Sequence, residues 1–361
     1  MARPNQARIN LSALRNNLGL VRQLAPTAKV MAVVKANAYG HGALTIAREL
    51  DARVDALAVA CIEEADELRA GQVSSPILLL EGLFEKAELA SAAERNYWVT
   101  VDNEQQLAWL EQARLPRPIR CLLKIDTGMH RLGVAPDEVV PFYRRLRACE
   151  NVSDDIVLTT HFASADDTGS DLTTSQLARF ESACQDLPGE RSAANSAGVL
   201  AWPASHYDWV RPGYMLFGNS PLIAHHPSAA ALEPVMTLAS AVISVRAVQP
   251  GETVGYGATW TATRPSRIAT VCIGYGDGYP RLAPNGTPVL VSGQRAPLAG
   301  RVSMDMITVD VTDLADVSIG DEVILCGDGL AAGEIARHAD TIGYELTTRM
   351  PARTPRVVVA R

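Results

Sequence analysis

The chain has 361 residues, which is too long for one ordinary domain and enough for a barrel together with a smaller unit. Hydrophobic residues make up 47% of it, enough for a large core, and the formal net charge is −7. An acidic chain without basic clusters excludes the electrostatic footprint of a nucleic-acid-binding protein and of a polybasic membrane-binding surface.

Val30–Lys35 is the first predicted strand, and its apolar residues indicate a buried strand that ends on a lysine. A loop of small residues follows and leads into a predicted helix from Ala43 to Leu50. The carboxyl end of a buried strand is where α/β proteins place their chemistry. Burial lowers the pKa of a lysine, and a neutral amine condenses with an aldehyde. On position alone, a simpler interpretation is that Lys35 extends from the strand end into solvent.

Short apolar runs alternate with helical patterns through the first two thirds of the chain. The predicted strands are Val30–Lys35, Ala56–Cys61, Ile77–Glu81, Trp98–Val101, Arg120–Ile125, Val157–Phe162, Ser192–Asn195 and Trp209–Arg211. The predicted helices between them are Ile62–Ala70, Glu85–Arg95, Glu104–Arg114, Pro136–Ala148 and Ser175–Leu187. Eight strands with helices over about 220 residues predict a (β/α)8 TIM barrel. A doubly wound open sheet is the alternative, but no G-x-G-x-x-G follows the first strand, which disfavours a dinucleotide-binding fold.

After about Leu232 the pattern changes to short strands separated by turns. The predicted strands are Val235–Val248, Arg267–Ile273, Pro288–Val291, Met306–Val311 and Asp321–Leu325, with a short helix at Ala331–Ala339. We therefore expect residues 1–231 to form a barrel that carries the chemistry and residues 232–361 to form a mostly β domain.

Two motifs at predicted strand ends carry a resemblance to a known family. The segment K-A-N-A-Y-G-H-G runs from Lys35 to Gly42, and L-K-I-D-T-G-M-H-R-L-G runs from Leu123 to Gly133. Both resemble motifs of the alanine racemases, and the resemblance extends over nearly the full length. It implies an N-terminal barrel, a C-terminal β domain and pyridoxal 5′-phosphate as cofactor. It also implies that the first residues, near Ala7–Asn10, lie beside the β domain.

The resemblance assigns roles to the residues of these two motifs. Lys35 would hold the aldehyde of pyridoxal phosphate, and Tyr39 would help to position the cofactor. Arg131 would donate a hydrogen bond to the ring oxygen of the cofactor and take part in substrate binding. Lys124 would be carbamylated, which turns a cation into a carboxylate that orients Arg131; this modification is a hypothesis. Without the resemblance, Lys124 and Asp126 would be interpreted as a surface ion pair that stabilises little.

Further motif matches lie at other strand ends. His161, in T-H-F-A-S-A-D, would lie next to the cofactor according to the resemblance, although a lone histidine at a strand end is more often structural. The loops after strands seven and eight are the usual phosphate site of such barrels. Ser196 can bond a phosphate there, and Gly213, followed by Tyr214, lets backbone N–H groups approach it. In the family, Tyr344 would complete this phosphate site from the second domain.

The resemblance places Arg211 against the ring nitrogen of the cofactor. Many pyridoxal-phosphate enzymes pair that nitrogen with a carboxylate, which holds a proton on it and makes the ring a strong electron sink. An arginine cannot accept a proton, so the ring nitrogen is expected to stay unprotonated. A weaker electron sink suits a reaction that returns a proton to Cα without transamination.

Racemisation needs two bases, because a proton leaves one face of Cα and returns on the other. Lys35 would serve one face. The segment V-G-Y-G-A-T-W, from Val254 to Trp260, resembles the family motif in which Tyr256 is the other base, contributed by the partner subunit. The enzyme would then be a homodimer with composite sites. Tyr275 and Met304 would come from the same partner, narrow the entrance and hold the substrate, which the resemblance implies is L- or D-alanine.

Other functions remain as alternatives. A racemase of the same family could act on serine or lysine. A non-catalytic pyridoxal-phosphate carrier resembles only the barrel, so a β domain carrying Tyr256, Tyr275 and Met304 disfavours it. A barrel decarboxylase would need a carboxylate at the position of Arg211 and a catalytic cysteine at the position of Ser303. Both the supply of D-alanine for peptidoglycan and the catabolism of D-alanine are compatible with the same site.

The remaining features bear on compartment and metals. The six cysteines are widely spaced and lack C-x-x-C pairs, which predicts reduced thiols in a cytoplasmic protein. The polar N-terminus lacks the apolar core of a secretory signal, and no apolar run reaches the roughly 20 residues of a membrane span. The pair His225-His226 is interpreted as a solvated loop, so we expect no metal.

Overall fold

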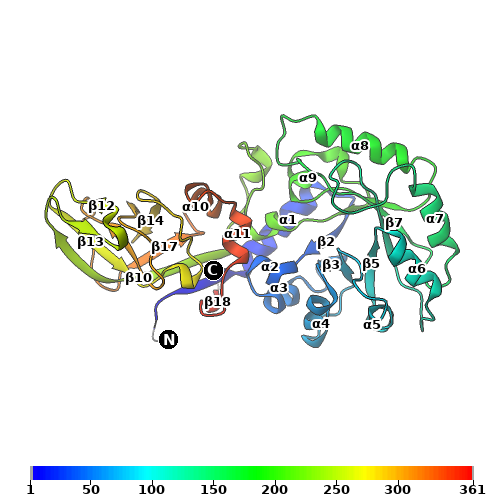
Figure 1. Cartoon of the computed structure of the whole chain (residues 1–361), viewed down its shortest axis with the longest axis horizontal. Helices are drawn as coiled ribbons and strands as arrows, with labels where there is room; N and C mark the ends of the chain where they lie inside the picture. The colour runs from blue at the N-terminus through cyan, green and yellow to red at the C-terminus, as the bar shows by residue number, and fades with distance from the viewer. Residues whose placement is uncertain (1–2, 360–361) are drawn as a thin grey trace.

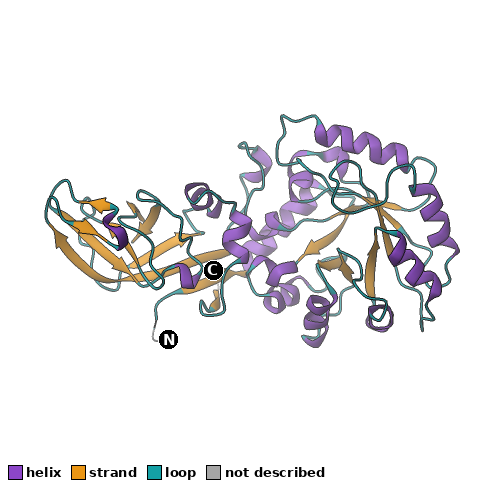
Figure 2. Ribbon diagram, in the orientation of Figure 1, coloured by secondary structure: helices purple, strands orange, loops and turns teal. Residues whose placement is uncertain are grey.

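The computed structural model describes residues 3–359. Figure 1 shows two units, a barrel on the right and a β domain on the left, with α11 (Gly343–Thr348) and β18 (Arg356–Val359) between them. Helices surround the strands of the barrel, whereas the other unit consists mainly of strands (Figure 2). The predicted class, a TIM barrel followed by a mostly β domain, is confirmed.

Eight parallel strands close the barrel in the order of the sequence. They are β2 (Lys29–Val33), β3 (Ala56–Val59), β4 (Ile77–Leu79), β5 (Tyr97–Val101), β6 (Cys121–Lys124), β7 (Val157–Thr159), β8 (Glu190–Ser192) and β9 (Trp209–Val210). Closure is completed by the pairing of β2 with β9. The interior of the barrel is filled by side chains such as Met31, Leu78, Leu122 and Trp209. The barrel is therefore a packed core, and a functional site is expected at one of its ends.

The barrel helices bury one apolar stripe each against the strands. In α3 (Ala43–Leu50) the buried residues are Ala43, Ile46, Ala47 and Leu50, the spacing of a single helical face. The others are α4 (Ile62–Ala70), α5 (Glu88–Arg95), α6 (Glu104–Gln112), α7 (Val139–Ala148), α8 (Leu172–Ala183) and α9 (Ser196–Ala201). Short 3-10 turns follow at η1 (Pro203–Ser205), η2 (Tyr214–Phe217) and η3 (Pro227–Ala229).

The structure corrects several predicted element bounds. Helix α1 (Leu11–Leu24) was not predicted, although the side chain of Asn10 caps it by accepting hydrogen bonds from two backbone N–H groups. Helix α7 begins at Val139 rather than Pro136, because Val134 is still bridged to Ile125. Strand β8 ends at Ser192, where Ser192–Asn195 was predicted to be the strand.

The β domain is an eight-stranded sheet built from both ends of the chain. Its strands are β1 (Gln6–Asn10), β10 (Met236–Val248), β13 (Ser266–Val271), β14 (Pro288–Val291), β15 (Gln294–Pro297), β16 (Ile307–Asp310), β17 (Glu322–Cys326) and β18. Strand β1 pairs antiparallel with β10 and parallel with β18. A two-stranded ribbon pairs β11 (Thr253–Val254) with β12 (Trp260–Thr261), and the turn η4 (Tyr256–Ala258) connects them. The turn η5 (Tyr275–Asp277) follows β13, and α10 (Ala332–His338) precedes α11.

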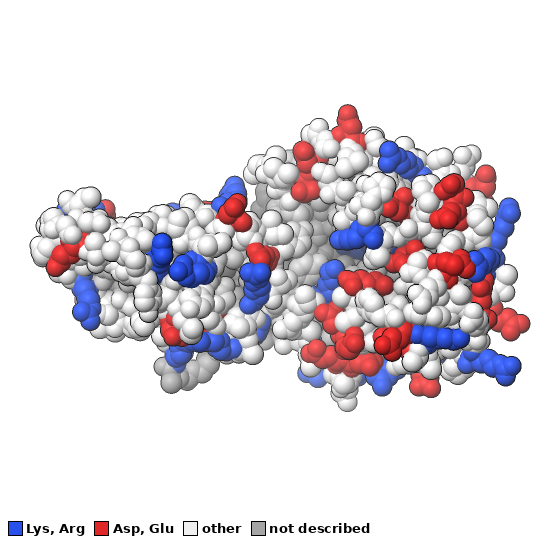
Figure 3. Space-filling model, viewed as in Figure 1, with Lys and Arg blue, Asp and Glu red and all other residues white. Residues whose placement is uncertain are grey.

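The surface carries charges of both signs (Figure 3), and the cysteines are unpaired. On the face shown in Figure 3, acidic and basic side chains are interspersed over both units without one large patch of either sign. All six cysteines are free thiols. Within residues 3–359 no helix is long and apolar enough to cross a membrane.

Candidate active site

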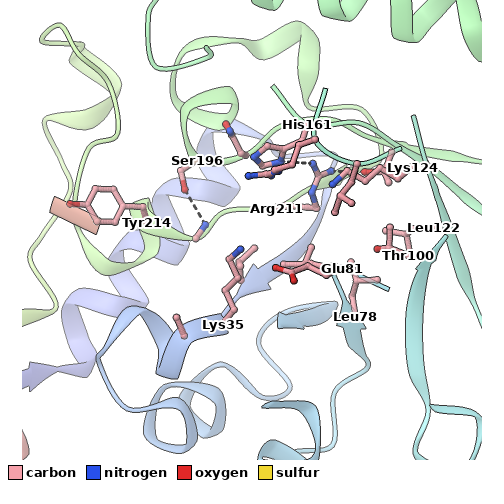
Figure 4. A pocket seen from close by; sticks show the side chains of 18 of the residues that line it. Lys35, Leu78, Glu81, Thr100, Leu122, Lys124, His161, Ser196, Arg211 and Tyr214 are labelled. Atoms are coloured by element: carbon pink, nitrogen blue, oxygen red, sulfur yellow. Dashed lines mark hydrogen bonds between the residues drawn. The ribbon is translucent and has the colours of Figure 1, made fainter. Parts of the chain in front are cut away.

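A cavity of about 580 Å³ opens at the carboxyl ends of the barrel strands (Figure 4). The site residues predicted from the sequence meet there, except Tyr256, Tyr275 and Met304. Those that line the cavity are Lys35, Tyr39, Lys124, Arg131, His161, Ser196, Arg211, Gly213, Tyr214 and Tyr344. Segments at the carboxyl ends of β2, β6, β7 and β9 thus converge with α11, which comes from the second domain.

Lys35 does not end strand β2, as the sequence predicted, but begins the short helical turn α2 (Lys35–Tyr39). Ala36–Tyr39 have φ between 52° and 54°, the left-handed region, although none of them is glycine. Such a conformation costs about 1–2 kcal/mol per residue, so surrounding contacts must hold the turn. The Glu64 carboxylate accepts the backbone N–H of Ala36 at 2.7 Å, directly after the lysine. This turn aims the Lys35 side chain into the cavity (Figure 4).

His41 holds the other end of the turn. Its Nδ1 lies 3.0 Å from the carbonyl oxygen of Ala38 and 2.9 Å from that of Tyr39, and its ring stacks on Phe217 at 4.4 Å. Burial lowers the pKa of His41 to about 4, so the ring is neutral and its Nδ1–H serves both carbonyls. Sequence reasoning missed His41 and Glu64, although His41 is part of the motif that carried the resemblance.

One end of the cavity is built from hydroxyl and amide groups. Ser196 Oγ accepts the backbone N–H groups of Gly213 at 3.0 Å and Met215 at 3.2 Å. A Cβ on residue 213 would lie 3.0 Å from Cζ of Tyr39 and closer still to its hydroxyl oxygen, so only glycine leaves room for this approach. The rings of Tyr214 and Tyr344 stack at 3.7 Å beside Tyr39.

Burial keeps these tyrosines protonated. It raises the pKa of Tyr39 to about 12 and raises the pKa values of Tyr214 and Tyr344 further. Neutral hydroxyls that donate hydrogen bonds, next to a serine and a glycine, suit a bound phosphate group. The phosphate end of pyridoxal phosphate therefore fits this part of the cavity.

Arg211 is a buried cation whose hydrogen-bond partners among residues 3–359 are all neutral. It donates to the hydroxyls of Thr159 at 3.0 Å and Ser192 at 2.5 Å, and to the carbonyl oxygen of Thr160 at 2.6 Å. Its Nη2 also lies 3.5 Å from Nδ1 of His161. Burial lowers the pKa of Arg211 to about 10, so it remains a cation near neutral pH. A group placed against this guanidinium meets hydrogen-bond donors and no proton acceptor.

The same cavity gathers positive charge. Burial lowers the pKa of Lys124 to about 8, and the cations of Arg211 and Arg131 lower it as well. Burial and then Arg211 lower the pKa of His161 well below its usual range, so His161 is neutral. Against Lys35 and these cations, Glu81 is the one carboxylate among the lining residues (Figure 4), and sequence reasoning did not identify it as part of the site. This excess of cations suits anionic ligands.

Tyr256, Tyr275 and Met304 do not reach the cavity within one chain. All three belong to the β domain, and their exposed fractions are 73%, 41% and 51%. Large apolar side chains that stay this exposed on neighbouring loops mark a contact surface more readily than a core. Among residues 3–359, no cluster of three or more His, Cys, Asp or Glu side chains could hold a metal ion.

Comparisons with known proteins agree over the whole chain. The family model described as "Alanine racemase, N-terminal domain" matches residues 9–221, and "Alanine racemase, C-terminal domain" matches residues 235–358. The chain is 50% identical over 346 residues to the biosynthetic alanine racemase of Escherichia coli strain K12, which covers 96% of both proteins.

Solved structures give the same result. The biosynthetic alanine racemase of Pseudomonas aeruginosa aligns with a TM-score of 0.95 and 48% identity over 99% of this chain and 100% of that one. An alanine racemase of Bartonella henselae with covalently bound pyridoxal phosphate aligns with a TM-score of 0.88 and 30% identity over 99% of both chains.

Proposed function

The chain belongs to the alanine racemase family, and we propose that it interconverts L-alanine and D-alanine with pyridoxal phosphate as cofactor. The observation that carries this proposal is the cavity that Lys35 shares with the buried Arg211, whose direct hydrogen-bond partners are hydroxyl and carbonyl oxygens rather than a carboxylate. This cofactor requires an amine for its aldehyde and an anion-binding site for its phosphate, and Lys35 and the groups around Ser196 and Gly213 are suited to these two tasks.

The cofactor would be held at three points. Lys35 would bind its aldehyde carbon, and Ser196, Gly213 and the hydroxyls of the tyrosine cluster Tyr39, Tyr214 and Tyr344 would hold the phosphate. Arg131 would donate to the ring oxygen. Pyridoxal phosphate, when bound, withdraws electrons from Cα of the amino acid and makes its hydrogen acidic. The protein's part is to place Cα between two bases and to keep water out.

Arg211 would set the outcome of the reaction. Its guanidinium would offer only donors to the ring nitrogen, and none of its hydrogen-bond partners among residues 3–359 is a carboxylate that could hold a proton there. The ring is then a weaker electron sink, and a proton returns to Cα faster than to other positions. This favours racemisation over transamination.

Lys35 and Tyr256 of the partner subunit would move the protons. Lys35 would first be freed, when the amino group of alanine takes its place on the aldehyde carbon. Its free amine would then take a proton from one face of Cα, and the Tyr256 hydroxyl would give a proton to the opposite face; the reverse reaction would exchange the roles. Tyr256 does not line the cavity of its own protomer and is exposed, which supports its action in a second subunit. The enzyme would thus be a homodimer with two composite sites.

Arg131, Tyr275 and Met304 would bind the substrate. Arg131 lines the cavity beside Lys124, whose lowered pKa leaves a fraction of free amine able to react with carbon dioxide. A carbamylated Lys124 would carry a negative charge that orients Arg131. Tyr275 and Met304 of the partner subunit would narrow the entrance, so that the methyl group of alanine fits and larger side chains do not.

We further propose a biosynthetic role, in which the enzyme supplies D-alanine for peptidoglycan in the cytoplasm. The names of the relatives from Escherichia coli and Pseudomonas aeruginosa support this role, and the free thiols are in keeping with a reducing compartment. Catabolism of D-alanine is the alternative role, and serine or lysine is the alternative substrate.

The test is the optical rotation of an L-alanine solution incubated with purified enzyme and pyridoxal phosphate. We expect the rotation to decay to zero at a rate proportional to enzyme concentration. The decay should be lost in Lys35→Ala and in Tyr256→Phe. Rotation that stays constant with the cofactor bound would refute the activity, and full activity of Tyr256→Phe would refute the two-base scheme.

A further inference from the structure

Asp277 is a fully buried carboxylate in the β domain that is contacted by both ends of the chain. Arg3 donates to its two oxygens at 2.9 Å and 3.0 Å. Arg353 Nε lies 2.8 Å from it, and Asn5 Nδ2 donates to it at 3.2 Å. A buried carboxylate needs this number of compensating donors, because an unpaired charge there would cost several kcal/mol.

Asp277 also fixes the turn on which it lies. Its Oδ2 accepts the backbone N–H of Gly274 at 3.0 Å, and its own carbonyl oxygen accepts the Thr354 hydroxyl at 2.8 Å. The turn η5, which carries Tyr275, is therefore held at its start by the carboxylate and at its end by the C-terminal segment.

The same cluster reaches the loop that carries Met304. The N–H of Gly276 donates to the Met304 carbonyl oxygen at 2.9 Å, which joins the two loops. Arg353 donates to the Asp305 carboxylate at 2.6 Å, and Arg3 donates to the Asp305 carbonyl oxygen at 3.3 Å. Two arginines from opposite ends of the chain thus bind both loops together.

The side chains carried by the two loops differ in solvent exposure from the carboxylate that holds the loops. Tyr275 and Met304 remain 41% and 51% exposed, while Asp277 beneath them has no exposed surface. Side chains that are exposed, but whose backbone is held by hydrogen bonds, can recognise a ligand with a fixed geometry. A cluster that only stabilised the domain would not have to bind the backbone of both loops.

We propose that Asp277, together with Arg3 and Arg353, is a positioning cluster that fixes Tyr275 and Met304 and so sets the width of the entrance to the partner subunit's site. This inference rests on the proposed function, in which these two side chains reach the neighbouring cavity. The two chain ends would therefore determine substrate selectivity without touching substrate.

The test uses the full-length enzyme and the variants Arg353→Gln and Arg353→Lys. Either variant leaves Asp277 paired with Arg3, which favours folding. Arg295→Gln is the matched control, because it removes an exposed ion pair with Glu334 elsewhere in the same domain. Two quantities are measured: amide hydrogen exchange in residues 274–278 and 303–306, and kcat and KM for alanine and for the bulkier serine.

For Arg353→Gln we expect faster exchange in both loops and a rise of about tenfold in the KM for alanine, with a smaller change in kcat. The ratio of kcat/KM for serine to that for alanine should rise. Arg353→Lys should restore part of each effect, and Arg295→Gln should match the wild type.

Unchanged exchange in the two loops would overturn the proposal, and so would faster exchange with unchanged KM and selectivity. In both cases the wild-type enzyme racemises alanine, so the proposed function survives. If the wild-type enzyme did not racemise alanine, the proposed function would be refuted, and with it the proposed role of the cluster at the entrance. The two proposals can therefore fail in distinguishable ways.

Discussion

Replacing Gly213 with alanine is expected to weaken pyridoxal-phosphate binding through Tyr39. A Cβ at this position would lie 3.0 Å from Cζ and 3.3 Å from Cε2 of the Tyr39 ring, and closer still to its hydroxyl oxygen. Carbon atoms in contact are about 3.5–4.0 Å apart. The ring has little room to move away, because it packs against Phe217 at 5.1 Å and Tyr344 at 6.1 Å. The tyrosine hydroxyl must therefore shift away from the phosphate end.

The size of the effect follows from the hydrogen bond that is lost. A hydrogen bond to a charged group contributes about 1.5–3 kcal/mol, so the Kd for the cofactor should rise at least about tenfold. In the Tyr39→Phe background the hydroxyl is already absent, and adding Gly213→Ala should change the Kd by less than about threefold. The double-mutant cycle thus isolates the contact between residue 213 and the hydroxyl.

The assay is a titration of the cofactor-free enzyme with pyridoxal phosphate, followed by the absorbance of the bound cofactor. Gly19→Ala serves as the control, because a Cβ on this residue of α1 meets nothing within 4 Å. An unchanged Kd in Gly213→Ala would refute the reasoning. Equal effects of Gly213→Ala with and without the Tyr39 hydroxyl would show that the substitution acts by another route.

Three further predictions concern the bases, the ring nitrogen and the turn. Mixing inactive Lys35→Ala and Tyr256→Phe subunits should restore up to about a quarter of wild-type activity, because half of the dimers are mixed and each has one intact composite site; no recovery after confirmed subunit exchange would place Tyr256 in its own subunit's site. Arg211→Glu should raise the ratio of transamination to racemisation, measured as pyruvate formed per turnover, and an unchanged ratio would contradict the role of Arg211. The pKa of His41 is about 4 in the folded protein against an ordinary 6.5, so the unfolded state binds more protons below pH 6.5. The free energy of unfolding should therefore fall by about 3 kcal/mol as the pH falls from 6.5 to 4. In urea unfolding, His41→Phe should lose stability less steeply over this range, and an identical pH dependence would contradict the assignment.

Local sequence signals predicted the barrel because most of its strands are short apolar runs and the helices between them have periodic apolar stripes; β8, with the sequence Glu-Arg-Ser, is the exception among the strands. The missed helix α1 had a usable signal, since Asn10 precedes a stripe that includes Leu14, Leu18 and Val21. The end of β2 had no such signal. The left-handed conformation that follows Lys35 is strained, and it is held by the neighbouring His41 together with the distant residues Glu64 and Phe217.

The residues of the candidate site also divide into those that local motifs indicated and those that depend on distant partners. Residues within the two long motifs, such as Lys35 and Arg131, were identified by resemblance because their order along the chain is itself the signal. Glu64 and Asp277 were not identified, since each acts through partners far away in sequence, 28 residues away for Ala36 and 274 for Arg3. Nothing in the local pattern around either carboxylate indicates such a partner.

The sequence by itself thus determined the barrel, the β domain, the family and ten of the residues that line the cavity, because periodicity and motif order are properties of the chain. Only the tertiary structure decided how Lys35 is aimed, that Arg211 is buried among neutral hydrogen-bond partners, and that the two chain ends meet at Asp277. The physical reason is burial. Charges and strained turns take their properties from neighbours that folding brings together, and those neighbours are distant in the sequence.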